Sequence, residues 1–420
     1  MAVPIPGKGN RTNGARGNPA KQSLRLEYPG KKSIEEILAI PPGCYKPSNA
    51  EGGGDNRLYH GDNIAVLTAL VQDEAVAGKV RLVYIDPPFA TAAAFESRKQ
   101  KHAYDDHLVG PEFVEALRER LVLIHRLLAD DGSLYLHLDG RMVFHLRVIL
   151  DEIFGEQNYR NCITRKKCNP KNYTRKTYGN VADYILFYSK TDTYVWHRPI
   201  EPWDEARAVK EYQCVDEQGR RYKKVPIHAP GVRNGETGKP WRGKLPPPGK
   251  HWQYTPATLD EMNARGEIYW SPNGNPRRKI YLKNSAGVPL QNIWMDMRDA
   301  HNQNIRITGY PTEKPPELLA RIIEASTNRG DLVMDCYSGS GTTLAVASSL
   351  DRRWIGVDRS DEAIKTTIRR LQHGTERMGD FVNRNSQPTV LPLFSVTDFT
   401  LYDETEEEPG LAKRAHGAPG

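Results

Sequence analysis

The stretch VMDCYSGSGTTLAVA (residues 333–347) contains an apolar run that ends in a carboxylate, two closely spaced glycines and a second apolar run. This pattern predicts a buried strand that ends at Asp335, a tight turn through Gly339 and Gly341, and a helix that begins near Gly341. At the carboxyl edge of a parallel sheet, such a turn lets a nucleotide-like ligand approach the backbone closely. A turn with only a structural role is the alternative interpretation.

The amino-acid sequence of this loop does not match two common nucleotide-binding motifs. Leu344 takes the place of the third glycine in G-x-G-x-x-G, and no Lys-Ser/Thr pair follows the glycines, as a P-loop requires. The next predicted strand ends in WIGVD, so Asp358 reaches the same sheet edge, where it can accept hydrogen bonds from ribose hydroxyls. Recognition of the ribose hydroxyls suits an NAD-type or an S-adenosylmethionine-type cofactor. The positions of the glycines in the loop favour the S-adenosylmethionine type. Capping of the following helix is the second interpretation of Asp358.

Strands and helices alternate on both sides of a long central insertion. Apolar spacing predicts strands over 79–86, 132–138, 331–336 and 353–358, and helices over 111–128, 141–154 and 316–326 and from about 341 and 361. This alternation predicts an α/β fold with a doubly wound, mostly parallel sheet. We expect residues 33–160 and 300–395 to form that domain together, and residues 161–299 to form a separate, loop-rich lobe.

The insertion carries the positive charge of the chain. The 420 residues include 59 Lys+Arg and 52 Asp+Glu, whereas residues 157–300 alone hold 26 Lys+Arg, 14 Asp+Glu and six of the seven tryptophans. Cations interleaved with aromatic rings suit a nucleic-acid surface, because cations meet phosphates and rings stack on bases. A merely solvated insertion is the alternative. The candidate DNA-contact residues are Tyr104, Arg165, Lys166, Lys167, Arg175, Arg277 and Arg278.

The remaining composition argues against several protein classes. No apolar run is long enough for a transmembrane helix, and the five cysteines form no C-x-x-C pair. The histidines show no metal-ligand spacing, so we predict no metal site and interpret His125, His137 and His145 as structural or surface residues. We expect a flexible basic arm over 1–32, an acidic and then flexible tail over 396–420, and a cytoplasmic protein that associates with the nucleoid through DNA.

The tetrapeptide DPPF (86–89) directly follows the predicted strand LVYI. Its two prolines, Pro87 and Pro88, end the strand and fix the backbone, so the turn presents one carboxylate, carbonyl oxygens and one ring. Asp86 and the Pro87 carbonyl can accept both N–H groups of an exocyclic amine on a planar base, while Phe89 stacks on the ring. Two acceptors would free the amine lone pair for attack. The alternative interpretation is that DPPF is a structural turn that ends the strand and packs the Phe89 ring in the hydrophobic interior.

The order of DPPF and a later glycine loop resembles the β-class of DNA amino-methyltransferases. The similarity extends over roughly residues 58–370 and includes LYHGDNIAVL (58–67), LADDGSLYLHLDGR (128–141), FGEQNYRNCI (154–163) and TGYPTEKPPELLARII (308–323). The segments FGEQNYRN and GYPTEKP are most similar to the sequences of the modification (Mod) subunits of type III restriction systems and of their solitary relatives.

The resemblance implies a Rossmann-like, S-adenosylmethionine-dependent catalytic domain in permuted order, with the target-recognition domain in the insertion. It implies that Asp86, Pro87, Pro88 and Phe89 hold a flipped base. It also implies cofactor contacts from Asp62 near the adenine, Thr312 and Lys314 near the amino-acid moiety, Asp335, Tyr337, Gly339, Gly341 and Thr342 on the methionine side, and Asp358 at the ribose. Glu313 stands where the common family spelling has Gln, and Cys336-Tyr337-Ser338 also departs from the usual loop.

We therefore expect site-specific methyl transfer from S-adenosylmethionine to the N6 amine of a flipped adenine in duplex DNA. The initial Asp of the tetrapeptide favours adenine, because the family's cytosine-N4 enzymes usually begin with Ser; cytosine N4 is the main competing target. An inactive DNA-binding module and an RNA or protein-amide substrate are less favoured. A carbon-methylating cysteine is disfavoured, since no Pro-Cys dipeptide occurs. The resemblance also implies a homodimer and leaves a restriction subunit open as a partner.

Overall fold

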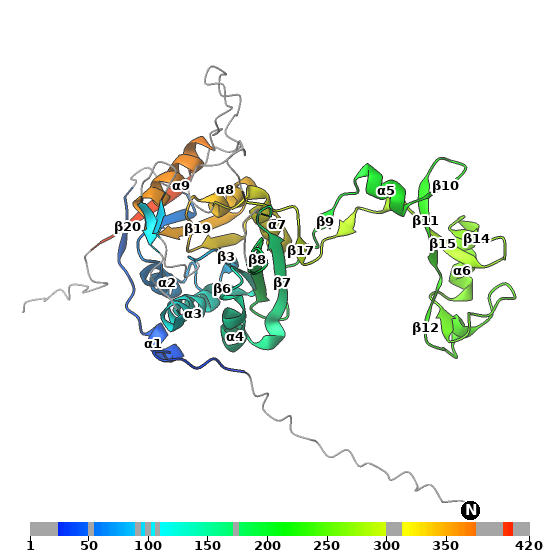
Figure 1. Ribbon diagram of the computed structural model, residues 1–420, viewed down its shortest axis with the longest axis horizontal. Helices are drawn as coiled ribbons and strands as arrows, with labels where there is room; N and C mark the ends of the chain where they lie inside the picture. The colour runs from blue at the N-terminus through cyan, green and yellow to red at the C-terminus, as the bar shows by residue number, and fades with distance from the viewer. Residues whose placement is uncertain are drawn as a thin grey trace, which may run out of the picture. The chain divides into compact units, whose positions relative to one another are not determined.

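The chain divides into two compact units. The computed structural model describes residues 24–48, 54–88, 110–170, 176–299, 313–374 and 398–405, together with the backbone of 94–96 and 102–105. The first unit comprises Met1–His197 and Gln291–Gly420, and the second comprises Arg198–Leu290 (Figure 1). Two segments that are distant in sequence thus complete the first unit, as the alternation of elements predicted.

A ten-stranded sheet forms the first unit, with the order β1-β20-β2-β19-β18-β3-β6-β8-β7-β17 (Figure 1). The six strands from β20 to β6 are parallel, β8 is antiparallel to both of its neighbours, and β17 is parallel to β7. The expected doubly wound, mostly parallel sheet is confirmed. The strands are β1 (Tyr45–Pro47), β20 (Phe399–Glu404), β2 (Asn56–His60), β19 (Arg353–Asp358), β18 (Leu332–Asp335), β3 (Val80–Ile85), β6 (Leu128–Leu138), β8 (Ala182–Ser189), β7 (Tyr159–Lys166) and β17 (Ile293–Trp294); β4 (Ala94–Glu96) and β5 (His102–Asp105) form a separate ribbon.

Helices cover both faces of this sheet (Figure 1). Successive residues of a strand point to opposite faces: Val83 and Ile85 belong to one hydrophobic core, whereas Leu82 and Tyr84 belong to the other. The first core includes buried residues of α2 (Asn63–Gln72), α3 (Gly110–Leu127) and α4 (Val143–Phe154), and the second those of α7 (Pro316–Ser326), α8 (Thr342–Ser349) and α9 (Asp361–His373). The short helices α1 (Ile34–Leu38) and η1 (Glu156–Asn158) complete the described part of this unit.

The second unit has its own sheet and its own core. Its four-stranded sheet has the order β10-β11-β15-β14, and a small core gathers Ile227, Trp241, Trp252, Leu259, Met262 and Ile268. The chain enters and leaves the unit through the antiparallel pair of β9 and β16. Its elements are β9 (Ile200–Glu201), α5 (Glu205–Glu211), β10 (Cys214–Val215), β11 (Arg221–Pro226), β12 (His228–Pro230), η2 (Glu236–Gly238), β13 (Lys250–Trp252), α6 (Pro256–Ala264), β14 (Ile268–Trp270), β15 (Pro276–Tyr281), η3 (Leu282–Asn284) and β16 (Val288–Pro289).

The boundaries of the second unit differ from the expected 161–299. Strands β7 and β8 belong to the main sheet, because β8 pairs with β6 from Ser133↔Ser189 to Leu138↔Tyr184 and buries its apolar side chains there. The basic, turn-rich composition that suggested the lobe continues across these strands, so composition alone did not mark where the sheet ends.

Both expected flexible ends contribute structure. Within the predicted arm, the backbone N–H of Leu26 donates to Glu152 at 2.7 Å and the Tyr28 hydroxyl donates to Glu115 at 2.6 Å. Within the predicted tail, β20 joins the sheet beside β2 and buries Phe399. The acidic residues near the end of this strand made its alternating apolar pattern hard to recognise in the sequence.

Among the described residues, no helix has the length and apolar character needed to cross a membrane.

Trp354 is one of the largest fully buried side chains among the described residues. This β19 side chain is fully buried in the core under α7–α9, and its indole N–H donates to Ser348 at 2.6 Å. We expect Trp354→Ala to lower the free energy of unfolding by about 3–5 kcal/mol, measured by urea denaturation. Trp196→Ala, at a side chain that is 46% exposed, is the control and should cost much less. Equal losses would contradict this assignment of the core.

Candidate active site

The carboxyl edge of the parallel strands gathers the predicted site residues. Strands β19, β18 and β3 are neighbours, and they end at or directly before Asp358, Asp335 and Asp86. Ligands bind at this edge in open α/β sheets, at the point where the strand order reverses. The structure therefore brings together the glycine loop and the DPP turn, which lie about 250 residues apart in sequence.

The glycine loop is held in a conformation that only glycine adopts easily. Gly339 and Gly341 have φ of +51° and +74°, in the left-handed region. A Cβ on Gly341 would lie 2.7 Å from the Thr367 hydroxyl oxygen of α9, so a side chain there would also clash. The loop is further fixed by Ser338, whose backbone N–H donates to the Val357 carbonyl at 3.0 Å. The predicted tight turn before α8 is confirmed.

Asp358 anchors this loop to the end of β19. One carboxylate oxygen accepts the backbone N–H of Gly339 at 2.8 Å, and the other accepts the N–H of Ser360 at 2.9 Å. Burial raises the pKa of Asp358, although these hydrogen bonds and the charge of Arg359 oppose that rise. Each carboxylate oxygen has a second lone pair, so ribose recognition by Asp358 stays a prediction.

Asp335 is the most deeply buried carboxyl group of the loop. It accepts the backbone N–H of Tyr337 at 3.0 Å and the hydroxyl of Thr343 at 2.6 Å. Burial raises its pKa to about 7, and the negative charges of Asp86 and Asp358 add to that rise. Such a carboxyl group gains or loses its proton near neutral pH, so its charge responds readily to a cationic ligand.

Asp86 has two carboxylate oxygens in different surroundings. The ammonium group of Lys314 donates to Oδ2, and both side chains are largely buried. Oδ1 is buried and accepts no hydrogen bond from any residue that the structure describes. A buried, unsatisfied acceptor is costly, and an amine N–H of a ligand would satisfy it. Phe89 lies outside the described residues, so its expected stacking stays a prediction.

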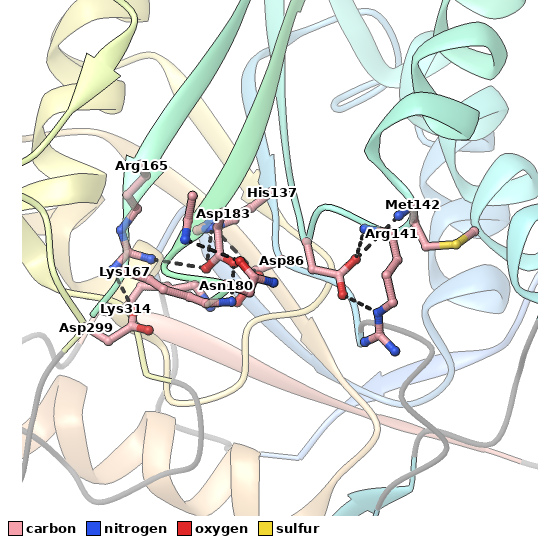
Figure 2. A network of polar contacts seen from close by, with 12 residues as sticks. Asp86, His137, Arg141, Met142, Arg165, Lys167, Asn180, Asp183, Asp299 and Lys314 are labelled. Atoms are coloured by element: carbon pink, nitrogen blue, oxygen red, sulfur yellow. Dashed lines mark hydrogen bonds and ion pairs between the residues drawn. The ribbon is translucent and has the colours of Figure 1, made fainter. Parts of the chain in front are cut away.

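A row of polar side chains continues from Asp86 across the neighbouring strands (Figure 2). His137 of β6 is fully buried, with Nδ1 4.0 Å from Asp86 Oδ1 and 2.8 Å from the Tyr84 hydroxyl. Its Nε2 lies 3.5 Å from Asp183 Oδ2 of β8. Burial lowers the pKa of His137, although the charges of Asp86 and Asp183 oppose that shift. The sequence indicates a structural or surface residue at His137, and the structure places it in the interior, beside Asp86 at the site.

The remaining predicted cofactor residues are placed around this edge. Asp62 caps α2 through the N–H of Ile64 at 3.0 Å, and Arg120 donates to it at 3.2 Å. Thr342 opens α8 and accepts a hydrogen bond from Arg370, which also pairs with Glu313. Lys314 pairs with Asp86, where the resemblance had implied a place beside the cofactor. Thr312 lies outside the described residues. No group of acidic, His or Cys side chains that could hold a metal ion occurs in the described segments.

The predicted DNA-contact residues separate into distinct environments. Arg165 is fully buried and donates to the Met297 carbonyl and to Asp299, each at 2.5 Å, so its guanidinium is unavailable to phosphate and the predicted contact is corrected. Lys167 pairs with Asp183 at 2.7 Å, and Lys166 is partly exposed. Arg277 is exposed, whereas Arg278 donates to the Tyr254 hydroxyl at 2.7 Å. Arg175 and the Tyr104 side chain lie outside the described residues.

Sequence reasoning missed the residues that support the site. His137 and Asp183 each interrupt an otherwise apolar strand near the sheet edge, in SLYLHL and ADYILFY, and that interruption was the available signal. Arg370 had no comparable signal, because it lies on a helix whose charged residues otherwise face solvent.

Similarity to known proteins agrees with this geometry. The family described as DNA methylase (N6/N4 methyltransferases) matches residues 80–369. The type II methyltransferase M.EcaI of Enterobacter cloacae is 44% identical over 400 residues, which cover 91% of this chain and 88% of that protein. The StyLTI Mod subunit of Salmonella typhimurium is 25% identical, over 77% of this chain but only 55% of that subunit, and the DNA adenine methyltransferase YhdJ of Escherichia coli is 26% identical, over 76% and 84%. The resemblance drawn from DPPF and the glycine loop is therefore confirmed, and this chain belongs to the DNA methylase family that modifies N6 or N4 amines.

Proposed function

We propose that this DNA methylase transfers the methyl group of S-adenosylmethionine to the N6 amine of an adenine that has left the DNA duplex. The observation that carries the proposal is the buried acceptor Asp86 Oδ1 beside the glycine loop, which receives no hydrogen bond from a described residue. The glycine loop follows β18 at the carboxyl edge of the sheet, and buried Asp335 and Asp358 suit a cationic, ribose-bearing cofactor. When bound there, S-adenosylmethionine supplies an electrophilic methyl group.

The residues of the chain have two roles, which are to activate the target amine and to hold it in position. The lone pair of an exocyclic amine is conjugated with the base ring and is a weak nucleophile. By accepting one N–H, Asp86 Oδ1 favours a tetrahedral nitrogen, and Lys314 keeps the carboxylate oriented through Oδ2. The DPP backbone fixes where this acceptor lies, which supplies the orientation that a transfer in line needs. Flipping the base costs a few kcal/mol, which contacts with the DNA backbone offset.

Adenine is favoured over cytosine as the target base. The initial Asp86 of the tetrapeptide supports adenine by resemblance, and one relative is named a DNA adenine methyltransferase. Two further relatives are modification subunits of type III restriction enzymes, which supports a role in site-specific modification. We further propose the homodimer that the resemblance implies and a cytoplasmic location on the nucleoid, and a restriction subunit stays open as a partner.

Nucleoside mass spectrometry of methylation-free genomic DNA tests the reaction. After incubation with the protein and S-adenosylmethionine, we expect N6-methyladenine. Asp86→Ala should abolish transfer and leave duplex affinity largely intact, because the contacts with the backbone lie elsewhere. Asp130→Ala, which removes a carboxylate that is 89% exposed at the start of β6, is the matched control and should stay active. N4-methylcytosine would overturn the choice of base, and an active Asp86→Ala variant would overturn the mechanism.

Cofactor affinity should depend on pH through Asp335. Its pKa of about 7 means that the carboxyl group is mostly neutral one unit below that value and mostly ionised one unit above it. Because S-adenosylmethionine is cationic, calorimetric affinity should be about tenfold higher at about pH 8 than at about pH 6. Asp335→Asn should remove this dependence. Asp351→Asn, at a side chain that is 65% exposed, should keep it, and a pH-independent wild type would refute the role of Asp335.

One face of the sheet in the second unit suits the DNA backbone. The register places Lys224 and Arg277, with Lys279, on the same face as Tyr222 and Tyr269; we call these five residues the cationic face. Lys224 lies directly opposite Lys279, and like charges so placed repel each other. None of the three cations forms an ion pair with a described carboxylate. On the opposite face, by contrast, Lys223 pairs with Glu211 at 2.7 Å.

The aromatic rings of this face hold its cations. Lys224 lies 3.7 Å from the Tyr269 ring centre, and Lys279 lies 5.5 Å from that of Tyr222. The four strands of this sheet contain no acidic residue at all. Unpaired cations that repel one another gain most from a polyanion, so the cationic face supports the proposed contact with phosphates better than the opposite face, which includes Arg278.

The salt dependence of DNA binding tests the cationic face. Lys224→Ala combined with Lys279→Ala should weaken duplex binding and reduce the slope of log K against log[salt] by about 2, since each phosphate contact contributes about 0.9. Lys223→Ala, on the same strand but the other face, is the matched control and should change the slope little. An unchanged slope in the double variant, or an equal loss in the control, would place the DNA elsewhere.

A further inference from the structure

Three neighbouring strands bring Asp86, His137 and Asp183 into one row at the site (Figure 2). Strands β3 and β6 are parallel, with Ile85 opposite Leu136, so the next residues, Asp86 and His137, are also adjacent. Strand β8 supplies Asp183 from the other side of β6. The row is buried: His137 is 0% exposed and Asp183 is 2% exposed. Buried polar rows are costly unless each member has a partner.

The partners of Asp183 decide where His137 carries its hydrogen. Asp183 pairs with Lys167 at 2.7 Å and with Arg165 at 3.7 Å. Burial alone would raise the pKa of Asp183, but the nearby imidazole of His137 and the hydrogen bond and charge of Lys167 outweigh it and lower that pKa. Asp183 is therefore ionised. Nε2 lies closer to a carboxylate, at 3.5 Å from Asp183 Oδ2, than Nδ1 does, at 4.0 Å from Asp86 Oδ1. Nδ1 also lies 2.8 Å from the Tyr84 hydroxyl, which can donate to it, so we assign the hydrogen of the neutral ring to Nε2.

The second ring nitrogen then faces Asp86 without a hydrogen. Nδ1 accepts the Tyr84 hydroxyl at 2.8 Å and lies 4.0 Å from Asp86 Oδ1, the oxygen that no described residue satisfies. Among the described residues, the charged and titratable groups that face His137 are Asp86 and Tyr84 from β3 and Asp183 from β8. Lys314 is bound to Asp86, and Lys167 and Arg165 lie behind Asp183. This arrangement is a base next to an acceptor, with a carboxylate behind it.

Methylation of an amine releases one proton in each turnover. As the methyl carbon leaves sulfur and bonds to nitrogen, the positive charge moves from the sulfonium to the amine. The amine becomes neutral again only when an N–H bond breaks, and the proton needs an acceptor. In a buried site, an acceptor close to the amine is worth about 10²–10⁴ in rate.

We propose that His137 takes up this proton through Asp86. The amine N–H bond breaks as a bond to Asp86 Oδ1 forms, and the proton then passes to His137 Nδ1, with the Tyr84 hydroxyl turning to accept from it. The resulting imidazolium is stabilised by Asp183 on its far side. Proton transfer requires the 4.0 Å gap between Nδ1 and Asp86 Oδ1 to close to a hydrogen bond when the base binds, because catalytic contacts tighten in the complex with substrate. After the product leaves, the proton returns by the same route, through Asp86, to the water that takes the place of the base.

The pH dependence of single-turnover methylation tests this inference, which rests on the proposed function. At saturating cofactor and DNA, the wild-type rate should fall as the pH drops below about 6.5, because the pKa of buried His137 lies below its usual value. His137→Gln should be about 100-fold slower and should lose this acidic fall, with unchanged affinities for cofactor and DNA. His125→Gln is the matched control: this histidine packs edge-on against Phe154 at 4.8 Å, and burial lowers its pKa to about 4.

A second variant separates proton transfer from packing. His137→Ala leaves a space that imidazole or pyrazole, which have the same size, can fill. Imidazole is a base near neutral pH and pyrazole is not, so only imidazole should restore the rate. Equal restoration by both compounds would show a packing role and overturn the inference. So would a His137→Gln variant with the wild-type rate or the wild-type acidic midpoint. An inactive wild type would instead refute the proposed function itself.

Discussion

The parallel pairing of β18 with β3 is the contact on which the active site depends. It places the strand that leads into the glycine loop beside the strand that ends at Asp86, although the long insertion separates them in sequence. Together with the parallel pairing of β18 and β19, it brings the loop fixed by Asp358, the buried carboxyl group of Asp335 and the acceptor oxygen of Asp86 to one edge. The pairing is buried on both faces by helices, which keeps these groups in register.

Much of the fold was predictable, because its signals are local. The apolar period of α3 and the continuous apolar runs of β3 and β18 identify their elements without tertiary information. The tight turn at Gly341 was likewise evident from two glycines between a strand and a helix, and the left-handed φ confirms it. The order of DPPF and this loop was distinctive enough to identify the family.

The rest could not be predicted, because it depends on pairing between distant strands. Arg165 has the composition of a DNA contact, and only its position between Asp183 and Asp299 shows that it is a buried structural residue. The place of His137 in the site was also not predictable, because its polar neighbours Asp86 and Asp183 come from two other strands. The limits of the second unit were also hidden, since β8 lies within basic sequence yet completes the main sheet. A count of charged residues over a segment does not separate buried positions from exposed ones.

The short pair of β9 and β16 gives the second unit a property of its own. Because the chain enters and leaves through two adjacent strands of two residues each, the ends of the unit are close together in space. A segment with neighbouring ends can be exchanged for another of different length and sequence without altering the strands that flank it. The resemblance implies that the insertion recognises the target, and on that proposal we expect exchange of the segment between β9 and β16 to change the DNA site and to leave the main sheet unaltered.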